Sequence, residues 1–140
     1  MTIRNLEKKD AAAVALLIPQ LTKNIVDPEK LAQRIEALTT AKDCQWLVAE
    51  KDNQVMGFGG LTWYVIPSKG LIAWIDELIV DEKFRGQGIA TALMQQLLTI
   101  AQQQNIIQVK LTSTGTAASN LYEKVGFTKK DQQYFIKKLS

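Results

Sequence analysis

The segment DELIVDEKFRGQGIATALMQQLL, residues 76–98, joins an apolar, strand-like run to a run with helical periodicity. At its centre, RGQGIA (residues 85–90) holds two glycines, an arginine and no proline. The first backbone N–H groups of a helix have no intrahelical partner, and the helix dipole adds positive charge there. Glycine lets a ligand approach these groups closely, and arginine presents donors suited to phosphate oxygens. The segment therefore predicts a cradle for a pyrophosphate group.

Plainer interpretations of the same loop remain open. Glycines between a strand and a helix are often only turn residues, and an arginine there is often only a solvated charge. The loop is neither a dinucleotide-binding fingerprint nor a P-loop, because Thr91 stands where the third glycine is required and no Gly-Lys-Ser/Thr follows. The loop alone does not identify its ligand.

Composition limits the chemistry that is available. With 140 residues, 46% of them hydrophobic, we expect a single domain over residues 1–140 with its own core. The net charge of +3 is small and scattered, which argues against a nucleic-acid partner. The absence of histidine and the single cysteine, Cys44, exclude an internal disulfide and a cysteine-built zinc site, so we expect no metal. The apolar stretch at residues 11–21 is too short to span a bilayer, so we expect a cytoplasmic protein without a membrane partner.

Periodicity predicts a mixed α/β chain with hairpins and a strand-helix-strand crossover. Strand patterns occupy residues 2–6, 45–51, 54–66, 70–80, 106–113 and 132–139. Helical patterns occupy residues 9–21, 27–38, 88–103 and 117–125. We expect Pro19 to interrupt the first helix, Asp27 to cap the second and Gly126 to stop the last.

Residues 76–98 resemble motif A of the GNAT superfamily of acyl-CoA-dependent N-acetyltransferases, whose loop pattern R/Q-x-x-G-x-G/A is matched by Arg85, Gly88 and Ala90. AASNLYEKVGF, residues 117–127, resembles motif B of the same family at the expected distance downstream. The resemblance is strong over residues 74–127, whereas the first 70 residues match only in their order of elements. It implies an α/β (α+β) fold of the GNAT type: a mixed, mostly antiparallel sheet with a splayed central strand pair and flanking helices.

The resemblance implies that acetyl-CoA is the co-substrate and that two segments hold it. The backbone of the splayed strand would pair with the pantetheine arm like an added strand, and the loop amides would hold the pyrophosphate. The implied cofactor-binding residues are Leu78, Ile79, Val80, Arg85, Gly86, Gln87, Gly88, Ile89, Ala90, Thr91 and Asn120.

The implied reaction is direct attack of a neutral primary amine on the acetyl carbonyl, through a tetrahedral intermediate. A backbone N–H near Val80 would stabilise the oxyanion, and the Tyr122 hydroxyl would protonate the departing thiolate. The alternative for Tyr122 is a core aromatic on a short helix. Asp76 and Glu77 are the candidate bases.

Strand geometry leaves the choice of base open. Adjacent strand residues face opposite ways, so only one of Asp76 and Glu77 points into a substrate cavity unless a bulge intervenes. Parity places Trp74, Asp76 and Leu78 on one face, which favours Asp76, whereas Glu77 is the more familiar family position. Both carboxylates have a structural alternative as capping, ion-paired or solvated groups.

The acceptor site is expected between the strands of residues 59–74, with Trp63, Tyr64 and Trp74 as an aromatic lining or else as core residues. The chain resembles the small-amine branch, such as aminoalkylphosphonate and glucosamine-phosphate N-acetyltransferases, more than histone-type enzymes, which is analogy at the level of the fold. A peptide N-terminus or lysine stays open as the acceptor. The alternatives to an enzyme are an acyl-CoA-binding sensor or partner module and an anion-binding domain unrelated to CoA. A homodimer is compatible with this size, but no segment specifies one.

Overall fold

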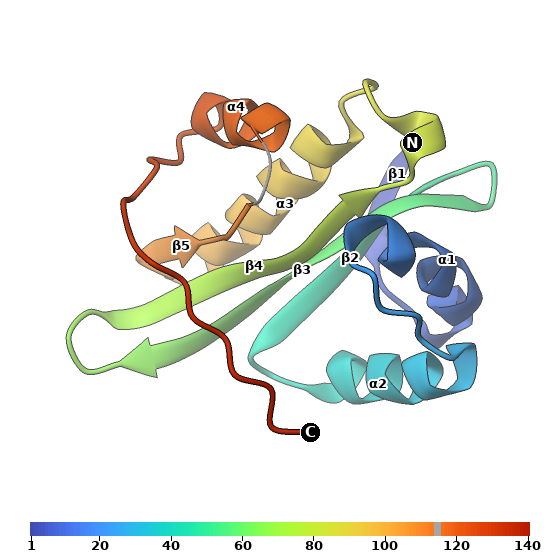
Figure 1. Cartoon of the computed structure of the whole chain (residues 1–140), viewed down its shortest axis with the longest axis horizontal. Coiled ribbons are helices and arrows are strands. Elements are labelled where there is room, and N and C mark those ends of the chain that lie inside the picture. Colours follow the sequence, from blue (N-terminus) through green and yellow to red (C-terminus); the bar gives the residue numbers. More distant parts are fainter. Residues whose placement is uncertain (114–115) are drawn as a thin grey trace.

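The computed structural model describes residues 1–113 and 116–140. Its sheet has the order β1-β2-β3-β4-β5, with helices on both faces (Figure 1). The strands are β1 (Thr2–Asn5), β2 (Cys44–Lys51), β3 (Gln54–Ile66), β4 (Gly70–Val80) and β5 (Gln108–Lys110). The helices are α1 (Ala11–Leu21), α2 (Pro28–Thr40), α3 (Ile89–Gln103) and α4 (Thr116–Lys124), with short 3-10 turns η1 (Lys8–Asp10) and η2 (Glu82–Phe84). Neighbouring strands are antiparallel except β4 and β5, which are parallel, and this confirms the expected fold class.

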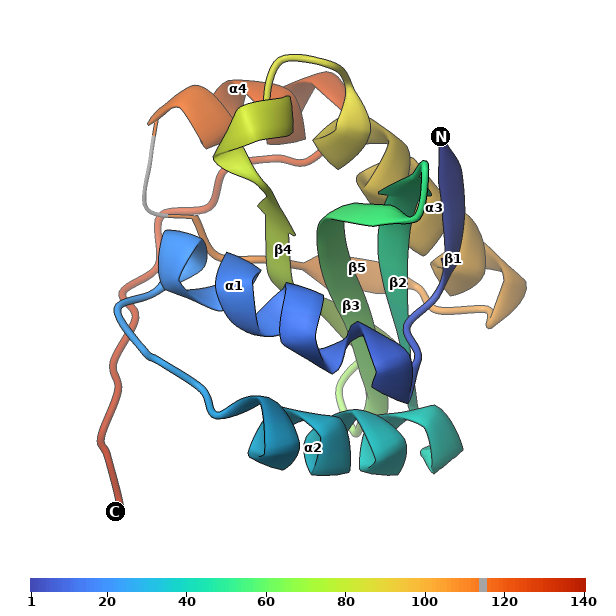
Figure 2. The same ribbon diagram turned by 90° about the vertical axis from the view of Figure 1, so that its right-hand side faces the viewer.

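The sheet separates two apolar cores. Helices α1 and α2 cover one face and α3 covers the other (Figure 2). Alternate residues of β2 serve the two cores, because successive strand side chains point to opposite faces: Leu47 packs on the α3 side and Val48 on the α1 and α2 side. No helix among the described residues is long and apolar enough to cross a membrane.

Local sequence signals set the helix ends. The Asp27 carboxylate accepts a hydrogen bond from Lys30 N (3.2 Å) and Pro28 is the first helical residue, so the predicted cap of α2 is confirmed. Helix α1 runs through Pro19 and ends at Leu21, so the predicted interruption at Pro19 is wrong. Pro19 lies in the last turn, so only Gln20 and Leu21 follow it in the helix.

Strand β4 contains a bulge at Glu77, whose backbone has φ 49°. Its pairing with β3 changes from Gly60 opposite Asp76 to Phe58 opposite Ile79, so two β4 residues face one on β3. That one is Gly59, where a Cβ would lie 2.8 Å from Leu78 Cδ1 and 3.3 Å from Leu78 Cα, so a larger residue would require Leu78 to shift.

The two parallel strands of the sheet diverge. Strand β5 pairs with β4 only opposite Ile72 to Trp74. In the described part of the chain, the β5-facing edge of β4 therefore has no ladder partner from Ile75 to Val80. This gap is the splayed strand pair that the family resemblance implied.

The closing strand predicted over residues 132–139 is wrong. Residues 128–140 form neither helix nor strand and are exposed, including the apolar Tyr134, Phe135, Ile136 and Leu139. A strand needs backbone partners on a neighbouring strand, whereas this segment runs away from the sheet (Figures 1 and 2). The strand predicted over residues 106–113 is also shorter, because β5 covers only Gln108–Lys110.

Candidate active site

The glycine loop lies where β4 ends and α3 begins. Gly86 and Gly88 have φ values of 80° and 79°, which L side chains rarely adopt. A Cβ on either glycine would meet no atom within 4 Å, so the space beside the loop is open. Gly88 directly precedes the first helical residue of α3. The Arg85 side chain folds back to the strand, where its Nε donates to Val80 O (3.1 Å).

The residues predicted to bind the cofactor differ in exposure. Arg85 to Gly88 are exposed, whereas Ile89 is buried in the core and contributes only backbone to the loop. Leu78 packs on the α3 side of β4, and Ile79 packs on the other side. Only their backbone groups lie together at the unpaired edge of the strand. Asn120 is exposed on α4, and Ala90 and Thr91 are half-buried in the first turn of α3. Asp81 and the turn η2 connect the strand edge to the loop.

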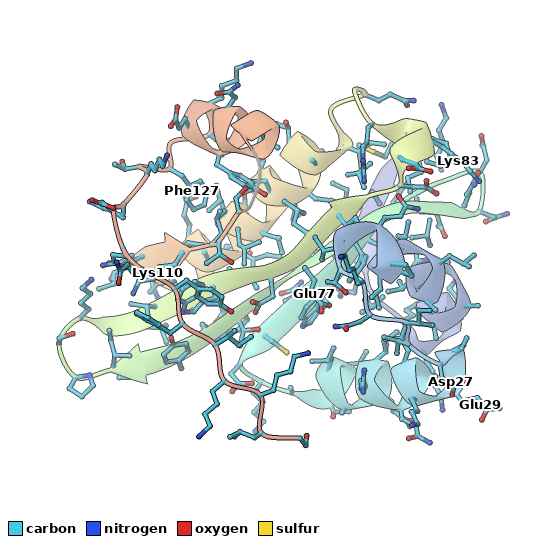
Figure 3. All side chains as sticks on the ribbon, in the orientation of Figure 1. Asp27, Glu29, Glu77, Lys83, Lys110 and Phe127 are labelled. Atoms are coloured by element: carbon cyan, nitrogen blue, oxygen red, sulfur yellow. The ribbon has the colours of Figure 1, made fainter. Side chains whose placement is uncertain are left out.

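Asp76 and Glu77 line the same cavity, which lies between α1, α2 and the sheet and has a volume of about 390 Å³. In Figure 3 the Glu77 side chain lies between β4 and the two N-terminal helices. Burial raises the pKa of Asp76, against the opposing effect of a hydrogen bond with Thr62. Burial also raises the pKa of Glu77, with a further rise from Asp76 and a partial offset from Arg34. The pKa of each carboxyl group is thus shifted upward, although both residues are partly open to solvent.

The bulge corrects the predicted strand parity. Asp76 keeps the face that parity predicted, and Glu77 joins it because of its left-handed backbone. Leu78 moves to the opposite face, where it packs against the α3 core. The prediction that Trp74, Asp76 and Leu78 share a face is therefore wrong for Leu78.

The aromatic residues predicted around the acceptor site fall into two groups. Trp74 Nε1 donates to the Tyr64 hydroxyl (2.9 Å), and Lys110 Nζ lies 5.7 Å from the centroid of a Trp74 ring. Trp63 instead packs against the core on the α3 side of the sheet. The structure brings Tyr64 and Trp74 together on the face that carries Asp76, and it separates Trp63 from them.

Tyr122 is half-buried on α4 at the edge of the α3 core. Its ring meets Phe127 edge-on at a centroid distance of 6.2 Å. Burial raises the pKa of the Tyr122 hydroxyl, so the phenol is protonated at neutral pH. The side chain therefore contributes to packing and also offers a neutral proton donor.

Four residues of the cavity that carry polar groups were not predicted from the sequence: Thr22, Asn24, Arg34 and Trp46. Arg34 lies on α2 beside the apolar face formed by Leu31 and Ile35, and it lines the cavity. The indole Nε1 of Trp46 is buried without a hydrogen-bond partner, although the Trp46 side chain is close enough to the Cys44 thiol to affect its pKa. The only signal in the sequence was the position of Arg34 at the border of an amphipathic face. Among the described residues, no three metal-ligating side chains come together.

Comparison with known proteins identifies the family. Residues 12–127 match the model of the acetyltransferase (GNAT) family. N-acetyltransferase 8B of Homo sapiens is 34% identical over 101 residues, which are 70% of this chain and 44% of that protein. L-2,4-diaminobutyric acid acetyltransferase of Halalkalibacterium halodurans is 26% identical over 127 residues, which are 89% of this chain and 64% of that protein. The chain thus spans less than two thirds of the length of either relative.

The fold is also that of solved acetyltransferase structures. Glucosamine-6-phosphate N-acetyltransferase from Arabidopsis thaliana superposes with a TM-score of 0.86, covering 99% of this chain and 98% of that one, at 23% identity. Identity this low supports the fold alone, but the family model covers most of the chain. The chain therefore belongs to the acetyltransferase (GNAT) family.

Proposed function

We propose that this chain transfers the acetyl group of acetyl-CoA to a primary amine of a small molecule. The observation that carries the proposal is the meeting of Asp76 and Glu77 in one cavity, on the strand whose free edge leads into the glycine loop. Both carboxyl groups have raised pKa values, as a base that works near neutral pH requires. Family membership supports the reaction class, and the acceptor would bind in the cavity.

Acetyl-CoA supplies the acetyl group and the thiolate leaving group. Its pantetheine arm would pair with the backbone of β4 from Leu78 to Val80, because main-chain hydrogen bonds can hold an extended arm. At this edge Val80 O already accepts from Arg85 Nε (3.1 Å), so Val80 offers only its N–H. The pyrophosphate of acetyl-CoA would rest on the amides of Arg85 to Thr91, where Gly86 and Gly88 leave open space. The residues present therefore fit the co-substrate, and Asn120 would add a side-chain contact to the arm.

Three groups of the chain have roles in the proposed reaction. Asp76 or Glu77 takes a proton from the substrate ammonium, which frees the amine to attack. The N–H of Val80 stabilises the oxyanion. Asp81 N donates to Met56 O on β3 (2.8 Å), so it points toward β3. Because successive N–H groups of a strand point to opposite edges, the N–H of Val80 points to the free edge of β4. The Tyr122 hydroxyl gives a proton to the departing thiolate.

The size of the cavity suits a small acceptor. About 390 Å³ lies within the range of small-molecule sites, and apolar residues make up most of the walls. Two similar proteins carry names of small amine substrates, L-2,4-diaminobutyric acid and glucosamine-6-phosphate. The second candidate, an acyl-CoA sensor of the same fold, is favoured by no particular residue.

Two experiments test the proposal in sequence. Calorimetric titration of acetyl-CoA, with inorganic pyrophosphate as the control, tests the cofactor site. Thiol release with a panel of primary amines then tests transfer. Binding of acetyl-CoA followed by amine-dependent thiol release supports the enzyme. Binding without thiol release from any amine favours the sensor, and equal affinity for pyrophosphate points to a general anion site.

A further inference from the structure

The cavity holds one cation that the proposed reaction leaves unused. Arg34, on α2, lines the cavity together with Asp76 and Glu77. Within the described part of the chain its guanidinium makes no hydrogen bond or ion pair, although it is near enough to lower the pKa of Glu77. An arginine has five N–H donors in a fixed fork, which matches the oxygens of a carboxylate or phosphate.

The charges of the cavity have an ordered arrangement. The two carboxyl groups come from β4 and the guanidinium comes from α2, which lies across the cavity. The apolar side chains of Val14, Ile18 and Phe58 line the same cavity, and the three charged residues are exposed. A ligand with an ammonium at one end and an anion at the other would pair with the carboxyl groups of β4 and with the guanidinium of α2.

An amine without an anionic group fits this arrangement less well. Its ammonium would satisfy the carboxylates but would sit near an unpaired guanidinium of the same sign, and this repulsion selects against it. Thr22 and Asn24 also line the cavity, where they offer neutral polar groups and no second cation.

We propose that the acceptor is a small amine that also carries a carboxylate or phosphate, and that Arg34 binds this anionic group while Asp76 and Glu77 face the amine. The inference rests on the proposed acetyl transfer, because it names the class of substrate of that same site. It makes Arg34 a specificity-determining residue rather than a member of the proton-transfer machinery.

The test uses pairs of acceptors with and without the anion, and rates are referred to the same protonation state of the amine. Amino acids with the amine at the α or the ω position are compared with their carboxamides, and 2-aminoethyl phosphate is compared with ethanolamine. The readout is kcat/KM from thiol release. We expect the anionic member of at least one pair to be preferred about 10- to 100-fold, the range for hydrogen bonds to charged groups. The preferred pair also distinguishes a carboxylate from a phosphate.

Variants of α2 isolate the contribution of Arg34. Arg34→Gln should abolish the preference through a higher KM, Arg34→Lys should keep part of it, and the Kd for acetyl-CoA should stay unchanged in both. Lys30→Gln removes an exposed cation of the same helix outside the cavity lining, and it should behave as wild type. Equal use of acids and amides, or a preference that survives Arg34→Gln, overturns the inference and leaves acetyl transfer standing. No thiol release from any pair, with acetyl-CoA still bound, overturns both.

Discussion

Asp76 and Glu77 are consecutive residues of one strand, yet both side chains line the same cavity. The cause is the left-handed backbone of Glu77 (φ 49°), which inserts one extra residue into β4. A residue with a β-carbon is strained in this conformation, and such strain persists where the surrounding structure imposes it. The bulge therefore costs stability and brings a second carboxyl group to the site.

The strain at Glu77 can be measured through glycine. We expect Glu77→Gly to be more stable than Glu77→Ala by about 1 kcal/mol, because glycine adopts positive φ without strain. Urea unfolding of the two variants gives the difference. The control is Glu36 in α2, where Glu36→Gly should be less stable than Glu36→Ala by about 1 kcal/mol. The same order at both positions would argue against strain at the bulge.

The raised pKa values predict how acetyl transfer depends on pH. A base must be ionised, so kcat/KM should rise with pH through a pKa above the ordinary carboxyl value of about 4. An acceptor amine that stays protonated over the whole range keeps its own titration out of the profile and still needs the base. We test Asp76→Asn and Glu77→Gln. The variant that removes the base should no longer show the rise of kcat/KM with pH. If both variants keep the wild-type profile, neither carboxylate is the base.

Tyr122→Phe tests the proton donor. We expect turnover to fall by about 10²–10⁴-fold, because a phenylalanine cannot protonate the thiolate. The ring contact with Phe127 is kept, so the stability and the Kd for acetyl-CoA should change little. Tyr134→Phe, in the exposed C-terminal segment, is the matched control. Turnover that matches the control would leave Tyr122 with packing alone.

Valine substitutions at two glycines with similar backbone conformations distinguish the effect of backbone strain on stability from an effect on ligand binding. Gly88 and Gly70 have φ values of 79° and 94°, and a Cβ on either meets no atom within 4 Å. Valine at either position should therefore cost about 1–2 kcal/mol of stability. Gly70 begins β4, at the opposite end from the loop, so only Gly88→Val should abolish acetyl-CoA binding in calorimetry. Normal binding by folded Gly88→Val would rule out the proposed cradle.

Local signals in the sequence predicted much of the fold. The cap at Asp27, the apolar run of β4 and the glycine loop before α3 each depend on a few neighbouring residues, and each lies where the sequence placed it. The bulge at Glu77 depends on pairing with Gly59 of another strand, so a parity count along β4 could not find it.

Contacts between segments that are far apart in the sequence could not be predicted from the sequence. Arg34 meets Asp76 and Glu77 across more than forty residues of chain, and no periodicity encodes that meeting. The segment at residues 132–139 has the composition of a strand, but a strand also needs a partner, which composition cannot specify.

A partly buried ion-pair cluster near the N-terminus predicts loss of stability in acid. Arg4 donates to both Asp10 oxygens (2.9 and 2.8 Å) and to Glu50 Oε2 (2.8 Å), and Asp10 is 4% exposed. Burial raises the pKa of Asp10, but hydrogen bonds from Arg4 and from Glu7 N outweigh it and hold the pKa below its ordinary value. A lowered carboxyl pKa stabilises the fold above the unfolded value of about 4, and this contribution is lost as the pH falls through the folded value.

Asp10→Asn tests this account of acid stability. At neutral pH the variant should be less stable by about 1–3 kcal/mol, because Arg4 loses a buried charged acceptor. Its stability should also fall less steeply below pH 4 or so, with the remaining slope partly from Glu50, whose pKa Arg4 also lowers. Lys8→Ala, which breaks the exposed Lys8–Glu36 pair (3.0 Å), should change stability by less than about 1 kcal/mol. Urea unfolding from pH 2 to 7 measures both, and an acid limb as steep in Asp10→Asn as in wild type would assign the acid sensitivity to other carboxylates.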